Sequence, residues 1–197
     1  MKLTLIRHGI TDGTARRLYY GSTDLPLTED GFRHIELLKK SCKYPSAPLF
    51  FTSGMLRTEQ TLKAIYGAVP HNVLPGMREA DFGSFEMRTY EQLKDDPDYI
   101  KWITGDNESN VCPGGESGVI VTKRAMEALE PLIHANTDAV CITQGGVIGG
   151  LLARWFPTEN ARFKYTPEPG YGYSIFFTDG KPVSLISVPE QNTCDNQ

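Results

Sequence analysis

The sequence predicts an α/β fold, a three-layer αβα sandwich with a mostly parallel central sheet. Short apolar segments alternate with segments of helical periodicity along the chain, as in folds whose sheet is covered by helices on both faces. Residues 3–6 and 139–143 are apolar or β-branched without interruption, which is typical of strands buried on both faces. Polar or glycine residues directly follow each of these segments. They therefore lie at the carboxyl ends of the strands, which is where parallel sheets bind their ligands.

The first part of the chain contains two strands and two helices by these criteria. Residues 3–6 predict the first strand, and Thr28 predicts the N-cap of a helix that extends to about Lys40, because two acidic residues follow it. Residues 49–52 predict the second strand. Residues 56–65 predict a helix that ends near Gly67.

The second part continues the alternation and ends in antiparallel strands. A short helix is expected over 90–102 with a break at Pro97, since proline removes a backbone donor and clashes with the preceding turn. The other expected elements are a helix over 118–134, a strand over 139–143, a helix over 147–155, and strands over 173–177 and 183–188 around a turn at 178–180.

Length and composition bound the class of protein. The chain has 197 residues, 40% of them hydrophobic and 22% charged, which predicts a single domain over 1–197 with a loose polar tail over 190–197. The formal net charge is −4, from 20 basic and 24 acidic residues, so the chain lacks the strongly basic surface that nucleic acid requires. No apolar run is long enough for a membrane span.

The cysteines and histidines are widely scattered, with no metal-ligand spacing and no disulfide framework. We therefore expect a cytoplasmic protein without a metal or cofactor and with no nucleic-acid or membrane partner. A homodimer is left open.

Two strand ends carry the residues of an anion site. Arg7 and His8 directly follow the first strand, and Arg57 lies in the first turn of the helix after the second strand. Arginine can clamp a phosphoryl group through two hydrogen bonds, and histidine is a capable nucleophile at neutral pH. Each residue alone is more simply interpreted as a surface side chain. Together at one edge of a sheet they predict a phosphate cradle.

Five ordered motifs give the chain a resemblance to the histidine phosphatase superfamily, in its phosphoglycerate-mutase-like branch that includes α-ribazole phosphatases. The resemblance covers about residues 3–177. The motifs are Arg7-His8-Gly9 with Thr11, residues 17–28 with Gly31, residues 53–61, residues 78–83 with Glu86, and residues 113–117.

The resemblance implies a role for each matching residue. His8 would be the nucleophile that forms a transient phosphohistidine, and Arg7 and Arg57 would hold the phosphoryl oxygens. Glu79 would protonate the leaving oxygen and later activate water. Without the resemblance, Glu79 would be interpreted as a surface loop residue.

Gln144 is the main departure from the family pattern, which has a histidine before the Gly145-Gly146 pair. Glutamine can donate hydrogen bonds to a phosphoryl oxygen but supplies no positive charge. The loss of one preorganised donor costs on the order of 10²–10³ in rate, so we expect reduced turnover.

Other phosphate contacts are expected around this centre. Gly145 is expected to expose its N–H group to the anion, and the resemblance places Gly21 and Ser22 among the contacts. Thr14 stands near the place of a phosphate-binding asparagine, for which its hydroxyl is a partial substitute. Met87 replaces a glycine and is expected to reshape the substrate mouth.

Three functions fit these residues. The leading hypothesis is a phosphatase that hydrolyses a small phosphomonoester through a phosphohistidine on His8. The second is a catalytically impaired protein that binds phosphate esters, and the third is mutase-type phosphotransfer. The sequence does not separate natural divergence at Gln144 from an engineered substitution.

Overall fold

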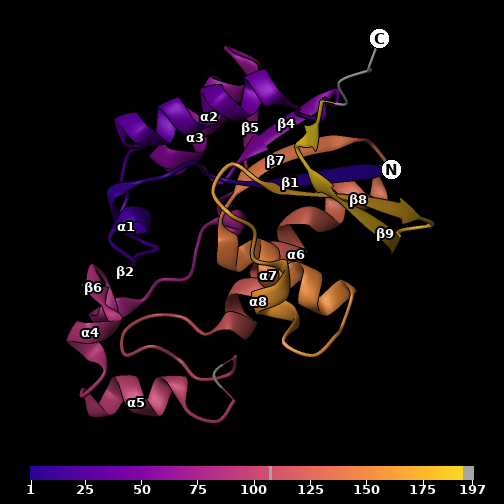
Figure 1. The fold of residues 1–197 in the computed structure, drawn as a ribbon. Coiled ribbons are helices and arrows are strands. Elements are labelled where there is room, and N and C mark those ends of the chain that lie inside the picture. The colour runs from indigo at the N-terminus through magenta and orange to yellow at the C-terminus, as the bar shows by residue number, and fades with distance from the viewer. Residues whose placement is uncertain (107, 193–197) are drawn as a thin grey trace.

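The computed structural model, which describes residues 1–106 and 108–192, is built on a six-stranded sheet with the order β5-β4-β7-β1-β8-β9 (Figure 1). The first four strands in this order run parallel, and β8 and β9 are antiparallel additions at one edge. The predicted mostly parallel sheet is therefore confirmed. The strands are β1 (Lys2–Arg7), β4 (Leu49–Thr52), β5 (Asn72–Val73), β7 (Ala139–Thr143), β8 (Gly172–Thr178) and β9 (Lys181–Val188).

Helices cover both faces of the sheet, which confirms the three-layer αβα architecture. In Figure 1 one group of helices lies above the sheet and another lies below it. Each face has its own core, one around Ile35 and Leu62 and the other around Leu129 and Leu151. The upper helices are α2 (Glu29–Ser41) and α3 (Leu56–Tyr66), and the lower ones are α6 (Gly118–His134), α7 (Gly145–Trp155) and α8 (Ala161–Tyr165).

The helix starts follow local chemistry. Thr28 caps α2, as predicted, because its side-chain oxygen accepts a hydrogen bond from the backbone N–H of Gly31 at 3.0 Å. Ser117 caps α6 in the same way, through the N–H of Ile120. Gln144 stands at the N-cap position of α7 without such a bond, so its side chain is free for other partners.

Strand register brings the predicted site to one edge of the sheet. Arg7 is paired with Thr143 at the carboxyl ends of the parallel strands β1 and β7, and Thr52 is paired with Ile142. All five residues of β7 are buried, so the position of this central strand is fixed by packing on both faces. The residues that follow these strands therefore lie along the same edge of the sheet.

A lobe of short elements lies beyond this edge, on the left of Figure 1. Its core is aromatic: Tyr19 and Phe85 each lie near Tyr99 and Trp102, with ring centroids 5.6–5.7 Å apart. The elements are α1 (Asp12–Ala15), β2 (Leu18–Tyr19), a 3₁₀ turn (Gly83–Phe85), β6 (Arg88–Thr89), α4 (Tyr90–Leu93) and α5 (Pro97–Ile103). The expected break at Pro97 is present: the region 90–102 forms two separate helices, and Pro97 is the first residue of α5.

The C-terminal tail is partly ordered, in contrast to the prediction. Strand β10 (Glu190–Gln191) pairs with β3 (Cys42–Lys43), because the backbone groups after α2 offer it an antiparallel partner. Asn192 extends this contact with an N–H bond to the carbonyl of Ser41. The remaining residues of the expected loose tail, 193–197, lie outside the described residues. None of the helices in the described ranges has the length and apolar character of a membrane span.

Candidate active site

His8 lies at the end of β1 with only 3% of its surface exposed. Its Nδ1 is 2.7 Å from the carbonyl oxygen of Gly9, and because a carbonyl only accepts, Nδ1 carries the proton. Burial, and then the positive charges of Arg57 and Arg7, lower the pKa of His8 well below 6.5. The ring is therefore neutral at pH 7, with the lone pair on Nε2. That is the protonation state a nucleophilic histidine requires.

Arg57 is fully buried beside this ring. Its Nε donates to Oε1 of Gln144 at 2.9 Å, and its two terminal nitrogens donate to the carbonyl oxygens of Thr23 and Gly21, both at 3.0 Å. The guanidinium also lies 5.1 Å from the ring centre of Tyr20, within cation–π distance. A guanidinium has five N–H groups, so two remain for a ligand after these three bonds. Arg57 is a charge held in one orientation by the protein.

Arg7 is placed differently. Its Nη1 donates to the carbonyl oxygen of Pro167 at 2.8 Å, whereas its buried Nε has no hydrogen-bond partner within the described part of the chain. A Cβ added at Gly145 would lie 3.0 Å from this Nε, so the glycine lets the arginine lie against the start of α7. A buried donor without an acceptor costs about 1–3 kcal/mol. An anion bound here would remove that cost.

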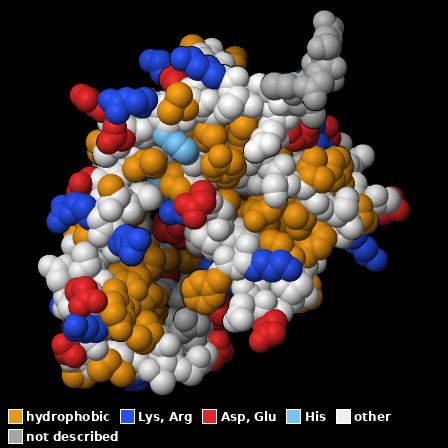
Figure 2. All heavy atoms as spheres, in the orientation of Figure 1, with side chains coloured by type: hydrophobic (Ala, Val, Ile, Leu, Met, Phe, Trp, Pro, Cys, Tyr) orange, Lys and Arg blue, Asp and Glu red, His pale blue; other side chains and the backbone are white. Residues whose placement is uncertain are grey.

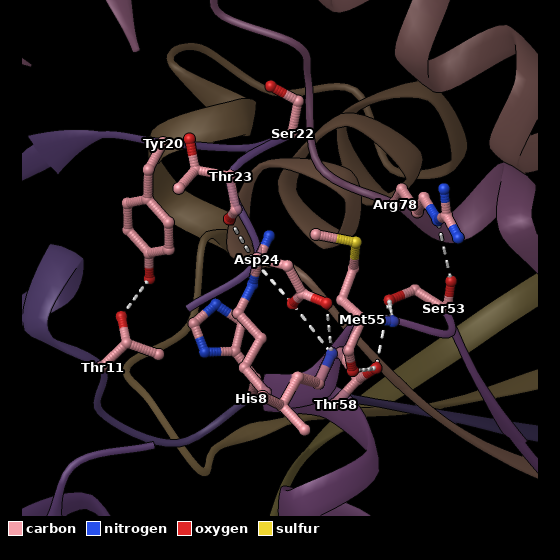
Figure 3. A network of polar contacts seen from close by, with 12 residues as sticks. His8, Thr11, Tyr20, Ser22, Thr23, Asp24, Ser53, Met55, Thr58 and Arg78 are labelled. Atoms are coloured by element: carbon pink, nitrogen blue, oxygen red, sulfur yellow. Dashed lines mark hydrogen bonds and ion pairs between the residues drawn. The ribbon is translucent and has the colours of Figure 1, made fainter. Parts of the chain in front are cut away.

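The side-chain amide of Gln144 is completely buried and joins two strand ends. Its oxygen must face Arg57, because the Nε of that residue can only donate. Its nitrogen then donates to Oγ of Ser53 at 3.1 Å, and Ser53 in turn is 3.1 Å from the hydroxyl of Thr58. The amide orientation follows from this network, part of which is drawn in Figure 3. One amide hydrogen of Gln144 is left for a ligand.

Glu79 reaches the same centre, where its charge acts on the guanidinium of Arg57. Its carboxylate accepts hydrogen bonds from the backbone N–H groups of Ala80 and Gly146, both at 3.0 Å. Gly146 is in the first turn of α7, where the exposed N–H groups and the helix dipole favour an anion. The N-terminus of α7 therefore holds the carboxylate of Glu79, and Gly145 and Gly146 contact Arg7 and Glu79 respectively.

The three remaining predicted phosphate contacts have protein partners. The hydroxyl of Thr14 is 2.7 Å from that of Tyr20, and the N–H groups of Gly21 and Ser22 donate to Oε1 of Glu86 at 2.8 and 3.0 Å. Phosphate binding by Thr14, Gly21 and Ser22 stays a prediction. In this structure their polar groups hold the loop around residues 20–24.

Sequence reasoning assigned Glu86 to a motif without giving it a role. Its carboxylate accepts from the N–H groups of Gly21, Ser22 and Phe82 and from the hydroxyl of Thr23. Burial alone would raise the pKa of Glu86, but these hydrogen bonds outweigh it and hold the pKa below its ordinary value. The charged carboxylate thus ties the loop of residues 21–23 to the aromatic lobe.

Figure 2 shows a hollow on the left of this face, with acidic side chains inside it and hydrophobic side chains along its lower rim. A separate cavity of about 990 Å³ lies between α6, α7 and α8 and includes none of the predicted site residues. Within residues 1–106 and 108–192, no three His, Cys, Asp or Glu side chains are grouped as a metal site would need.

Ser53 contacts Gln144, and Arg124 contacts the backbone carbonyl of Glu79, and sequence reasoning gave neither a role. Ser53 follows β4 and accepts from Gln144, which only the sheet register reveals. Arg124 interrupts the apolar stripe of α6, between the buried residues Val121 and Ala125. In the sequence, the position of this arginine next to the apolar stripe is the only feature that could have pointed to its role.

The sequence as a whole matches one family model. The model of the histidine phosphatase superfamily (branch 1) matches residues 3–186, which is almost all of the described chain. The chain belongs to this superfamily. The resemblance inferred from the motifs that contain Arg7, His8 and Arg57 is therefore confirmed.

Two curated relatives show the breadth of activities in the family. An adenosylcobalamin/alpha-ribazole phosphatase of Salmonella typhimurium is 29% identical over 161 residues, which cover 78% of this chain and 79% of the relative. A protein of Yersinia enterocolitica named "Probable phosphoglycerate mutase GpmB" is 30% identical over 158 residues, covering 78% of this chain and 74% of the relative. The chain is therefore similar both to a protein named as a phosphatase and to one named as a probable mutase.

Solved structures agree on the fold. The alpha-ribazole phosphatase of Shigella flexneri has a TM-score of 0.83 at 23% identity, with 96% of each chain covered. A phosphoglycerate mutase of Thermus thermophilus has a TM-score of 0.72 at 29% identity, covering 95% of this chain and 99% of that one. The αβα architecture is therefore that of phosphoglycerate-mutase-like proteins.

Proposed function

We propose that this protein hydrolyses a small phosphomonoester through a phosphohistidine formed on His8. The observation that carries the proposal is the state of His8: buried, neutral, with Nδ1 bound to the carbonyl of Gly9 and with two arginines beside it. A neutral imidazole presents Nε2 as a nucleophile, and the cations attract the phosphoryl group that it attacks. A structural histidine would have no need of two neighbouring cations.

The reaction has two steps. In the first, which starts from Glu79 in its protonated form, Nε2 of His8 forms a bond to phosphorus, the ester P–O bond breaks, and the leaving oxygen takes the proton from Glu79. In the second, water attacks the phosphohistidine, the N–P bond breaks, and Glu79 takes a proton from the water. Inorganic phosphate leaves, and both residues return to their starting states.

The arginines have complementary roles in this proposal. Arg7 offers a buried Nε–H without an acceptor in the described part of the protein, and Arg57 offers two remaining N–H groups on a guanidinium that is already oriented. Donors that are fixed before the reaction cost no reorganisation as charge shifts in the transition state. Turnover without a metal cofactor is consistent with this supply of positive charge.

Gln144 limits the rate in this proposal. It stands where the family pattern has a histidine, and its oxygen takes the Nε–H of Arg57 away from the substrate. The same observation favours a second candidate, a protein that binds phosphate esters with little turnover. Because one relative is named as a probable mutase, mutase-type phosphotransfer is a further candidate activity of this site. A cytoplasmic location and a homodimer stay predictions from the sequence.

The test is to trap the intermediate. Wild-type protein is mixed with a ³²P-labelled aryl phosphate, quenched in base, and assayed for protein-bound label that is lost in acid, as phosphohistidine is. We expect such label on the wild type and none on His8→Asn, which also loses phosphate release by on the order of 10⁴-fold or more. His134→Ala changes an exposed histidine and serves as the matched control.

Each outcome separates the candidates. Binding of the ester with neither label nor phosphate release on the wild type favours the impaired binding protein, whereas label without net phosphate release favours mutase-type phosphotransfer. Unchanged turnover of His8→Asn would remove the phosphohistidine mechanism altogether.

A further inference from the structure

Glu79 lies in a segment, residues 76–81, that has little regular structure of its own. A single 3₁₀ turn (Pro75–Met77) begins it, and neither a helix nor a strand follows before Gly83. Backbone N–H and C=O groups that are not in regular structure have to find other partners when they are buried. In this segment the partners are mainly side chains of α6, of β7 and of the loop before α6.

Arg124 of α6 binds three carbonyl oxygens of this segment. Its Nη1 donates to the carbonyl oxygens of Gly76 and Arg78, both at 2.7 Å, and its Nη2 donates to that of Glu79 at 2.9 Å. A Cβ at Gly76 would lie 2.7 Å from the Cβ of Ala128, so the glycine lets the segment lie directly on α6. One guanidinium therefore fixes the backbone on both sides of residue 78.

Glu116 holds Arg124 in this orientation. Nε and Nη2 of Arg124 donate to the two carboxylate oxygens of Glu116 at 2.9 and 2.8 Å, a bidentate pair. Glu116 also accepts from the N–H of Asp81 at 3.0 Å, so it binds the segment beyond Glu79. The hydrogen bonds from Arg124 are the main reason that the pKa of Glu116 is below its ordinary value, which keeps the pair charged.

The backbone position of residue 79 determines where its carboxylate lies. Arg124 binds the Glu79 carbonyl on the α6 side, and the side chain extends from there to the Gly146 N–H of α7 at 3.0 Å. A backbone shift of about 1 Å would break this contact and move the acid away from the leaving oxygen. Misplacements of that size can cost on the order of 10²-fold in rate.

We propose that Arg124, oriented by Glu116, is a positioning residue that sets where Glu79 transfers its proton. This inference rests on the proposed function, in which Glu79 is the general acid. Arg124 acts on the reaction through the backbone of the Glu79 segment, and its guanidinium is bound by five protein contacts.

The test is leaving-group dependence in Arg124→Lys. Lysine keeps the charge, but its single ammonium cannot reproduce the fork that binds several carbonyls and a carboxylate at once. Dinitrophenolate leaves without a proton, whereas an alkoxide needs one. We expect kcat/KM to fall by about 10²-fold for an alkyl phosphate and by less than about 3-fold for dinitrophenyl phosphate, because only the first depends on general acid catalysis.

Two companion variants separate this inference from the proposed function. Glu79→Gln has to show the same selective loss, and Lys123→Ala, the exposed neighbour of Arg124 on α6, has to show none. If Glu79→Gln loses both substrates equally, the proposed role of Glu79 is wrong, and this inference is wrong as well. If Glu79→Gln is selective but Arg124→Lys loses both substrates equally, only the inference fails.

An NMR measurement tests the same inference without turnover, so it can be used even if the wild type has low activity. The amide proton resonance of Gly146 reports its hydrogen bond to Glu79. We expect Arg124→Lys and Glu116→Gln to shift this resonance in the direction that Glu79→Gln does, while Lys123→Ala leaves it in place. An unmoved Gly146 resonance in a folded Arg124→Lys protein would overturn the positioning role.

Discussion

His8 and Glu79 are held in place by two different kinds of structure. His8 follows the last residue of β1, and its own N–H donates to the carbonyl of Thr143 at 2.9 Å, which continues the register of the sheet. Glu79 lies in a segment without helix or strand, held by side chains of Arg124, Glu116 and Thr143. The proposed nucleophile is thus fixed by backbone pairing, and the proposed acid by a few replaceable side chains.

Because His8 and Glu79 are held differently, substitutions near each of them are expected to have different effects. A substitution near His8 leaves the strand pairing intact and changes the chemistry of the centre. A substitution at a side chain that holds the Glu79 segment is expected to move the proposed acid without changing the residues around His8. Three variants or conditions test this contrast, from the largest expected effect to the smallest.

Gln144→His is expected to raise phosphate release by on the order of 10²–10³-fold. A histidine that is protonated beside the bound phosphate dianion cannot accept from the Nε of Arg57, so that N–H becomes available to the phosphoryl oxygen and the imidazolium adds a charged donor to those of Arg7 and Arg57. Steady-state release from an aryl phosphate measures the effect. Gln144→Met, which is of similar size but nonpolar, is the control and gains nothing. Equal turnover of wild type and Gln144→His would show that glutamine suffices here.

Thr143→Val tests whether the sheet and the Glu79 segment depend on each other. The Thr143 hydroxyl donates to the Met77 carbonyl at 2.7 Å, and its loss is expected to lower the free energy of unfolding by about 1–3 kcal/mol. Thr4→Val breaks a buried bond of the same length to Ser174 within the sheet and should cost a similar amount. Denaturant unfolding measures both.

Activity distinguishes the two valine variants. Only Thr143→Val should also lower kcat/KM for an alkyl phosphate, since only it releases a carbonyl of the Glu79 segment. Equal rates for the two variants would mean that the segment keeps its position without Thr143.

The smallest effect is a dependence of stability on pH. The pKa of His8 in the folded protein is below 6.5, so the unfolded chain binds more protons as the pH falls through 6.5. We therefore expect the wild type to lose stability as the pH falls from 6.5 to about 5, and His8→Asn to lose less over this range. Glu86 and Glu116 contribute only at lower pH, because their ordinary pKa value of 4.5 is lowered further. Parallel curves for both proteins would mean that His8 titrates normally.

Much of the fold could be predicted from the sequence because local patterns and packing agree there. The uninterrupted apolar run at 139–143 is a strand with five buried residues, and Thr28 caps the helix that its acidic neighbours predicted. Pro97 was correctly expected to interrupt a helix, but it starts a new one. Strand β10 was missed because its partner, β3, lies far away in the sequence and has no pattern of its own.

The site was predictable where it follows strands and less so where it depends on loops. Arg7, His8 and Gln144 come at the ends of strands, so the sheet brings them together. The N–H groups of Gly21 and Ser22 turned out to face Glu86, because a carboxylate from the distant lobe supplies their acceptor. Spacing along the chain does not contain that information.

The segment between Asp81 and Glu116 leaves the α/β body and returns to it at almost the same point. The N–H of Glu116 donates to the carbonyl of Asp81 at 2.8 Å, and the intervening lobe has its own small core around Phe85, Leu93 and Tyr99. Loop-closure entropy grows slowly with length, by about 0.6 kcal/mol for each doubling. The entropic cost of closing this segment at its base would therefore change little with its length, whereas its pairing with β2 and its hydrogen bonds to Gly21 and Ser22 tie its lining to the site.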